Sequence, residues 1–292
     1  MIRTPSDMFH KATESGRLLS RASRPQNVVY SGLLAVITAL VLRVSIVKAV
    51  ACYLLIVLLY ALAVNFNNVS DLRTDELNKR TDNPLVSGAL RRSQLLLFSS
   101  LCLACIVALQ FVLAQPFTVV ATVGYLVLSY AYSDTFFDVK SRGLLGTLLL
   151  CFCYGSFPVI LGLTQNPVLM PGVTVALVAL VALSMAPLLL AKDYKDFRGD
   201  KATNKRTPLV QFGPRRLRLI VGGLSLAAGT AYGGLAFEYG VNGALVLASV
   251  IAYLVLIRKI HVSEGVMQKS YRAILMLVLL MMPVSVIWCA RP

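Results

Sequence analysis

The stretch "ACYLLIVLLYALAVNFNNVSDLRTDE", residues 51–76, joins an uncharged apolar run to a dense cluster of amides and carboxylates. Its apolar part belongs to a run long enough to cross the hydrocarbon core of a bilayer as a helix. Similar runs recur along all 292 residues, of which 57% are hydrophobic and only 14% are charged. Because soluble domains contain about 25% charged residues, the sequence predicts an all-α, polytopic membrane protein.

Nine transmembrane helices are expected, because nine apolar runs have the roughly 17–25 residues that a spanning helix needs. The predicted spans are 26–46, 47–67, 93–114, 116–133, 143–163, 171–192, 216–236, 240–257 and 271–289. The segment before them is polar and basic, without the apolar core of a signal peptide. We therefore expect an N-terminal segment at 1–25 and a single nine-helix transmembrane domain at 26–292.

Positive charge is concentrated in every second predicted loop. Lys and Arg are concentrated in the N-terminal segment and in the loops after spans 2, 4, 6 and 8, whereas the loop "TQNPVLMPG" and the other intervening loops have few or none. By the positive-inside rule, the N-terminus is cytoplasmic and the C-terminus lies across the membrane. This retention of basic residues accounts for the net charge of +15. We expect no nucleic-acid partner, because no recognition fold fits between the apolar runs.

Two acidic clusters follow spans 2 and 6, on the predicted cytoplasmic side. In the first cluster, Asn67, Asp71 and Asp75 are four residues apart, so a helix would place all three on one face. Charged groups at a membrane boundary that point into a bundle indicate a functional site.

The second cluster, "KDYKDFRGD" at 192–200, has the same character. Asp193, Asp196 and Asp200 have a spacing of i, i+3 and i+7, which again places them on one helix face. Two helices with inward carboxylates can bind Mg²⁺, which prefers oxygen ligands and bridges carboxylates to substrate phosphates.

Basic side chains interleave with these acids. They are Lys79, Arg80, Lys192, Lys195, Arg198, Lys201, Lys205 and Arg206. A diphosphate with its metal ions would use them, because Lys and Arg neutralise the oxygens that the metals leave free. Two other interpretations stay open: solvated loops with i,i+4 ion pairs, and ion coupling in a transporter, although transport sites usually lie near the membrane midplane.

Both motifs resemble the signatures of one enzyme family. The pattern Asn67-x-x-x-Asp71-x-x-x-Asp75 with "NPLVSG" at 83–88 resembles the first signature of the UbiA superfamily of intramembrane prenyltransferases. The segment at 192–200 with "KRTPLVQFG" at 205–213 is similar to the second. The resemblance implies nine helices around a central cavity, with the active-site loops on the cytoplasmic side.

The resemblance also implies the chemistry. The enzyme would be a Mg²⁺-dependent prenyltransferase that moves an isoprenyl group from a prenyl diphosphate to an aromatic or lipid-like acceptor and releases diphosphate. The implied catalytic and metal-binding residues are Asp71, Asp75, Asp196 and Asp200, with Asn67 and Asp193 assisting in substrate binding. In the alternative, a UbiA-type terpene cyclase, the same ionisation is followed by cyclisation.

A third segment, "YSDTFFDVK" at 132–140, resembles the family pattern Y-S-x-P-P-x-R-x-K only in part. Tyr132 and Lys140 match it, whereas Asp138 replaces a basic residue. Asn83 similarly stands where the family commonly has Arg before Pro. These departures keep the cyclase alternative open. The further residues expected to bind substrate are Arg24, Arg80, Tyr132, Lys140, Arg142, Lys192 and Lys195.

Overall fold

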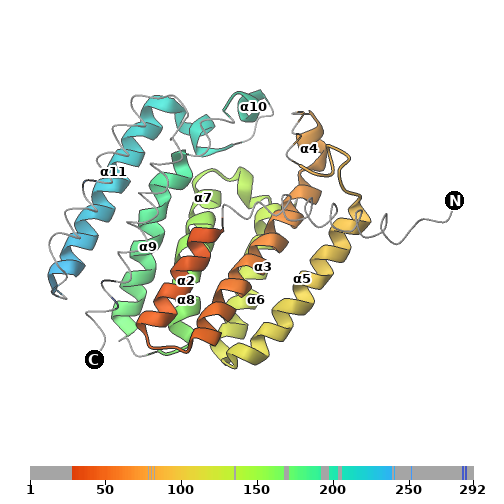
Figure 1. Cartoon of the computed structure of the whole chain (residues 1–292). Helices are drawn as coiled ribbons and strands as arrows, with labels where there is room; N and C mark the ends of the chain where they lie inside the picture. Colours follow the sequence, from red (N-terminus) through yellow and green to blue (C-terminus); the bar gives the residue numbers. More distant parts are fainter. Residues whose placement is uncertain are drawn as a thin grey trace, which may run out of the picture.

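The computed structural model of the chain is a bundle of helices that run roughly side by side (Figure 1). It describes residues 28–77, 79, 81, 83–134, 136–167, 171–191, 197–202, 206–238, 240, 251, 285 and 287. No strand occurs within these ranges, so the predicted all-α class is confirmed for them.

The elements that the structure describes are all helical. They are α2 (Val29–Val41), α3 (Ile46–Ser70), α4 (Leu72–Leu77), α5 (Arg92–Leu113), α6 (Pro116–Ser133), the 3₁₀ turn η2 (Val139–Ser141), α7 (Leu144–Cys151), the π-helical turn η3 (Phe152–Ser156), α8 (Phe157–Thr164), α9 (Pro171–Ala191), α10 (Phe197–Ala202) and α11 (Pro208–Glu238).

Five helices of the described part are long and apolar enough to cross a membrane, which makes the chain a multi-pass integral membrane protein. They are Ile46–Ser70, Arg92–Leu113, Pro116–Ser133, Leu144–Thr164 and Pro171–Leu190. The fourth combines α7, η3 and α8 into one continuous element. Helix α2 is apolar but shorter, and α11 corresponds to the predicted span at 216–236.

The first seven predicted spans each coincide with a helix, and the ends agree closely except at α2, α3 and α11. The largest difference that matters here is in α3, which continues to Ser70, beyond the predicted end at 67. The predicted spans 240–257 and 271–289 lie outside the described residues, apart from isolated positions, and so does the segment 1–25.

Two apolar clusters hold the helices together. One joins α2, α3, α5, α6 and α8 and includes Leu55 and Phe157, which are at most 1% exposed. The other joins α2, α7, α8, α9 and α11 and includes Leu177 and Leu217, both fully buried. Helices α2 and α8 contribute to both clusters and so connect the two halves of the bundle. Lipid tails are as apolar as leucine, so moving these side chains out of lipid contributes little free energy. Close van der Waals packing between the helices therefore stabilises the bundle.

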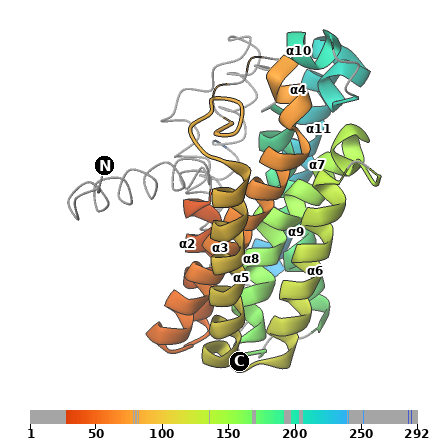
Figure 2. The same cartoon turned by 90° about the vertical axis from the view of Figure 1, so that its right-hand side faces the viewer.

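The two ends of the bundle differ in character. Helices α4 and α10, which carry residues of the two acidic motifs, lie at the same end in both Figure 1 and Figure 2. At the opposite end an open apolar groove of about 380 Å³ lies between the start of α3 and the end of α5. The groove is lined by Ile46, Val47, Val50, Ala51, Leu54, Leu109 and Val112. The described aspartates of both acidic motifs therefore lie at the α4 and α10 end.

Candidate functional site

The first motif straddles a break between two helices. Helix α3 ends at Ser70, Asp71 has φ −88° and ψ 0°, and α4 begins at Leu72. The Asp71 N–H donates to Asn67 O at 2.9 Å, and the Asp75 N–H donates to Asp71 O at 2.8 Å. The expected single helix is therefore interrupted at Asp71, which makes one i,i+4 hydrogen bond to each side of the break. This leaves Asp71 at the end of the long helix and Asp75 on the short one.

Lys140 forms an ion pair with Asp71. Its Nζ lies 2.6 Å from Asp71 Oδ1, 3.2 Å from Ser70 Oγ and 3.1 Å from the carbonyl oxygen of Ser133. An ammonium group has three donor hydrogens, and these acceptors match that number. The side chains of Lys140 and Asp71 are only 10% and 13% exposed. Partial burial strengthens such a charge-assisted contact, because water screens it less than at an open surface.

The loop after α6 presents Lys140 through local hydrogen bonds. Asp134 Oδ1 accepts from the backbone N–H of Phe136 at 2.9 Å, which forms a turn closed by a side chain. Asp138 adopts a left-handed conformation with φ 41°, and its Oδ1 accepts from Ser141 Oγ at 2.9 Å. Asp138, which departs from the family pattern, thus makes a defined local contact directly before the 3₁₀ element that carries Lys140.

Gly146 allows that 3₁₀ element to pack on α7. A Cβ at Gly146 would lie 2.8 Å from Val139 O and 3.2 Å from Lys140 Cα, which are both backbone atoms. On the other side of the same loop, the side chain of Gln211 lies directly against Gly143. Gln211 belongs to the segment that follows the second motif, so this loop contacts structure from both halves of the sequence.

Asp75 is held by a different residue, Asn83. Asn83 Nδ2 donates to Asp75 Oδ2 at 2.9 Å and to Asn68 O at 2.9 Å. Asn83 is fully buried, Asp75 is 4% exposed and Asn68 is 1% exposed. A buried carboxylate is stabilised by such a donor, because a polar group buried without a partner destabilises the fold.

The second motif is described only at its end. Asp200 is 8% exposed on α10, and α10 packs against α11. Four expected site residues, Lys192, Asp193, Lys195 and Asp196, lie outside the described residues, as do Arg24 and Arg80. The position of α10 places Asp200 at the same end of the bundle as Asp71 and Asp75 (Figure 1).

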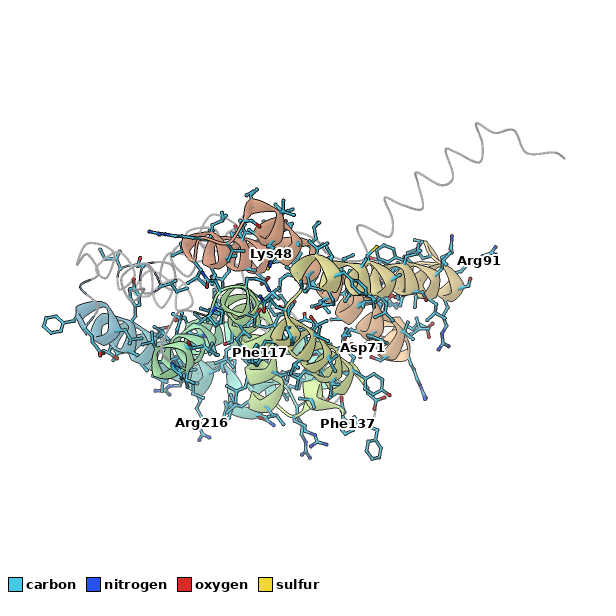
Figure 3. All side chains as sticks on the ribbon, turned by 90° about the horizontal axis from the view of Figure 1, so that it is seen from below. Lys48, Asp71, Arg91, Phe117, Phe137 and Arg216 are labelled. Atoms are coloured by element: carbon cyan, nitrogen blue, oxygen red, sulfur yellow. The ribbon has the colours of Figure 1, made fainter. Side chains whose placement is uncertain are left out.

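The remaining expected residues differ in their surroundings. Asn67 and Tyr132 are half-buried, whereas Arg142 is exposed. Figure 3 shows Arg91, Phe137 and Arg216 pointing outwards from the bundle, which contrasts with the inner position of Asp71. Within the described part, the structure therefore joins Lys140 to Asp71 and does not give Arg142 a comparable contact.

The donor chemistry at this end fits Mg²⁺. Asp71, Asp75 and Asp200 supply carboxylate oxygens, the ligand type that Mg²⁺ prefers. In the described ranges alone, no group of three His, Cys, Asp or Glu side chains is close enough to hold a metal ion. The other expected ligands, Asp193 and Asp196, are outside those ranges.

Sequence reasoning did not identify Asn83 or Gly146 as site residues. Asn83 was noticed only as a departure from Arg-Pro, although Asn before Pro is typical of a turn in which the side chain bonds to the backbone. Nothing in the sequence indicated Gly146, because its role depends on a backbone approach between η2 and α7.

Comparison with known proteins connects this architecture to a family. Residues 28–281 match the family model described as the UbiA prenyltransferase family. A digeranylgeranylglyceryl phosphate synthase from Methanoregula boonei is 27% identical over 205 residues, which cover 68% of this chain and 69% of that protein.

Solved structures share the fold. A UbiA homologue from Archaeoglobus fulgidus bound to GPP and Mg²⁺ superposes with a TM-score of 0.72 at 17% identity, covering 92% of this chain and 99% of that one. The same homologue bound to DMAPP and Mg²⁺ gives a TM-score of 0.71 at 17% identity, covering 92% and 98%. At this identity the likeness concerns the fold alone.

Proposed function

Because the chain belongs to the UbiA prenyltransferase family, we propose that the aspartates of its two motifs bind Mg²⁺ and a prenyl diphosphate at the mouth of a central cavity. The chain is an intramembrane prenyltransferase, which transfers a prenyl group and releases diphosphate. The observation that carries the proposed location is the buried pair of Asp71 and Lys140, next to Asp75 and at the same end as Asp200. The basic loops support a cytoplasmic location for this end.

The proposed metal ligands are Asp71, Asp75, Asp196 and Asp200, with Asn67 and Asp193 assisting. Bound Mg²⁺ would stabilise the negative charge that develops on the diphosphate as the C–O bond breaks. The Archaeoglobus homologue supports this assignment, since it binds Mg²⁺ together with GPP or DMAPP.

Lys140 has the chemistry to contact the diphosphate. Its ammonium already binds Asp71 with two further acceptors, and a diphosphate oxygen is a stronger acceptor than the hydroxyl of Ser70 or the carbonyl of Ser133. Charge on the diphosphate rises towards the transition state, so a fixed cation stabilises that state more than the bound substrate. The other proposed contacts are Arg24, Arg80, Tyr132, Arg142, Lys192 and Lys195.

The apolar helices have a separate role. They surround an isoprenoid chain with side chains of matching polarity and exclude water from the reacting carbon. Water excluded in this way cannot take the place of the acceptor. The acceptor's nucleophile forms the new bond to that carbon and loses its proton.

The acceptor we favour is a glycerol phosphate lipid that already carries an isoprenyl ether chain. The similarity to the Methanoregula boonei digeranylgeranylglyceryl phosphate synthase supports it. An anionic lipid also suits the basic loops at this end. Asn83, one of the departures that left a cyclase open, contacts Asp75 in a way that serves either reaction, so the cyclase stays the alternative.

One assay tests the reaction and the acceptor. The full chain in lipid nanodiscs is incubated with Mg²⁺ and geranylgeranyl diphosphate, first alone and then with the isoprenyl glycerol phosphate or an aromatic acid. Diphosphate release that requires the glycerol lipid supports the proposal. Diphosphate release with the aromatic acid alone overturns the proposed glycerol lipid acceptor. Diphosphate release without any acceptor, together with a cyclic hydrocarbon product, indicates a cyclase.

A further inference from the structure

We propose that Asn83 is a positioning residue that sets the orientation of the Asp75 carboxylate for Mg²⁺ binding. This inference rests on the proposed function, because it concerns how one of the proposed metal ligands is held. Asn83 lies in the turn between α4 and α5, eight positions after Asp75, and is fully buried.

The side-chain amide of Asn83 joins the two sides of the helix break at Asp71. One hydrogen of Nδ2 goes to Asn68 O in the last turn of α3, and the other goes to Asp75 Oδ2 on α4, both at 2.9 Å. The last four carbonyls of a helix lack partners inside it, so Asn83 also caps the end of α3. A single amide group therefore ties the end of the long helix to the carboxylate of the short one.

The orientation of this amide follows from its neighbours. Asn83 Oδ1 accepts from the Leu85 N–H at 3.0 Å, and the Ser87 N–H donates to Asn83 O at 3.1 Å. A flipped amide would place its oxygen against the Asn68 carbonyl and the Asp75 carboxylate, which are both acceptors. The turn at 83–87 thus determines the direction of the Nδ2 hydrogens.

A neutral donor is well suited to this position. It fixes Asp75 Oδ2 without adding a positive charge that would compete with a metal ion for the same carboxylate. Outer partners of this kind orient the ligands that touch the metal, and their loss typically lowers metal affinity or activity about 10–100-fold.

The experiment measures Mg²⁺ binding to the full chain without substrate, as the rise in Tm with Mg²⁺ concentration in nanodiscs. We expect Asn83→Ala to need about 10–100-fold more Mg²⁺ than the wild type for the same rise. Asn83→Ser keeps an acceptor for the Leu85 N–H but removes the contact with Asp75, and so preserves the turn. It should show the same loss, and saturating Mg²⁺ should restore most of the kcat of both variants.

The matched control is Asn166→Ala. Asn166 Nδ2 donates to Leu42 O at 2.8 Å, so it also binds a carbonyl at a helix end, but at the opposite end of the bundle. This variant should lose stability while its Mg²⁺ dependence stays unchanged. An unchanged Mg²⁺ dependence in either Asn83 variant, or an equal loss in the control, overturns the inference. A wild type that neither binds Mg²⁺ nor requires it for diphosphate release overturns the proposed function itself.

Discussion

Lys140 Nζ lies 2.6 Å from Asp71 Oδ1, although the two residues are 69 positions apart in the sequence. The contact joins the end of α3 to the loop between α6 and α7. A cation is thereby held next to a carboxylate that we propose as a metal ligand. With metal and substrate bound, we expect Lys140 to exchange part of this contact for a diphosphate oxygen.

Replacing Lys140 with Met removes the charge and keeps much of the apolar stem. We expect kcat/KM for the prenyl diphosphate to fall about 100-fold or more, because a fixed cation near the developing charge is lost. Lys140→Arg should retain part of the activity, since its planar group cannot reproduce three contacts in different directions. Lys48→Met, at the start of α3 and so at the opposite end, serves as the control. Wild-type kinetics in Lys140→Met would contradict the proposed contact.

Gly146→Ala should reduce activity without changing any charged residue. The new Cβ would lie 2.8 Å from Val139 O, so the 3₁₀ element and Lys140 must shift. We expect a rise in the KM for the prenyl diphosphate. Gly124→Ala is the matched control, because Gly124 has no atom within 4 Å of such a Cβ. Alanine there should be neutral or stabilise α6 by up to about 1 kcal/mol. Equal kinetics in the two variants would show that the η2 packing is unimportant.

Asp71→Ala and Asp196→Ala should each abolish measurable diphosphate release while the protein still folds. The loss of a group that stabilises developing charge typically lowers kcat about 10²–10³-fold, and chelation of Mg²⁺ in the wild type should have a comparable effect. Glu76→Gln provides a control for charge alone, since Glu76 is an exposed acid on the same short helix as Asp75. Full activity in both aspartate variants would remove these residues from the site.

Gly213→Ala should lower the Tm. Gly213 lies within α11, directly before Pro214, but its backbone is not helical, with φ 72° and ψ 163°. A left-handed φ at a residue with a Cβ costs roughly 1–2 kcal/mol. Gly223→Ala, an exposed and unobstructed position in the same helix, should leave the Tm unchanged or raise it. If Gly213→Ala had the same Tm as the wild type, the backbone at this kink would not require glycine.

The first acidic motif illustrates what sequence periodicity could and could not predict. The i,i+4 spacing of Asn67, Asp71 and Asp75 predicted one helix face, and the helical segments on either side of Asp71 fit the helical part of that prediction. It did not reveal that the helix breaks at Asp71, because the break is stabilised by partners that are distant in the chain. Lys140 was expected at the site from a resemblance, whereas its actual acceptors depend on the fold of the loop that starts at Asp134.

Local sequence was enough to predict the membrane class, the first seven helices and the first acidic cluster at the end of a helix. These features depend on local hydrophobicity and on spacings along a single helix, which act over a few turns. Which side chain holds each carboxylate depends on the three-dimensional fold: Lys140 at Asp71, and Asn83 at Asp75. Such pairings depend on where turns direct a few donor hydrogens and on how closely two backbones approach at Gly146. Neither property is encoded in any short stretch of residues.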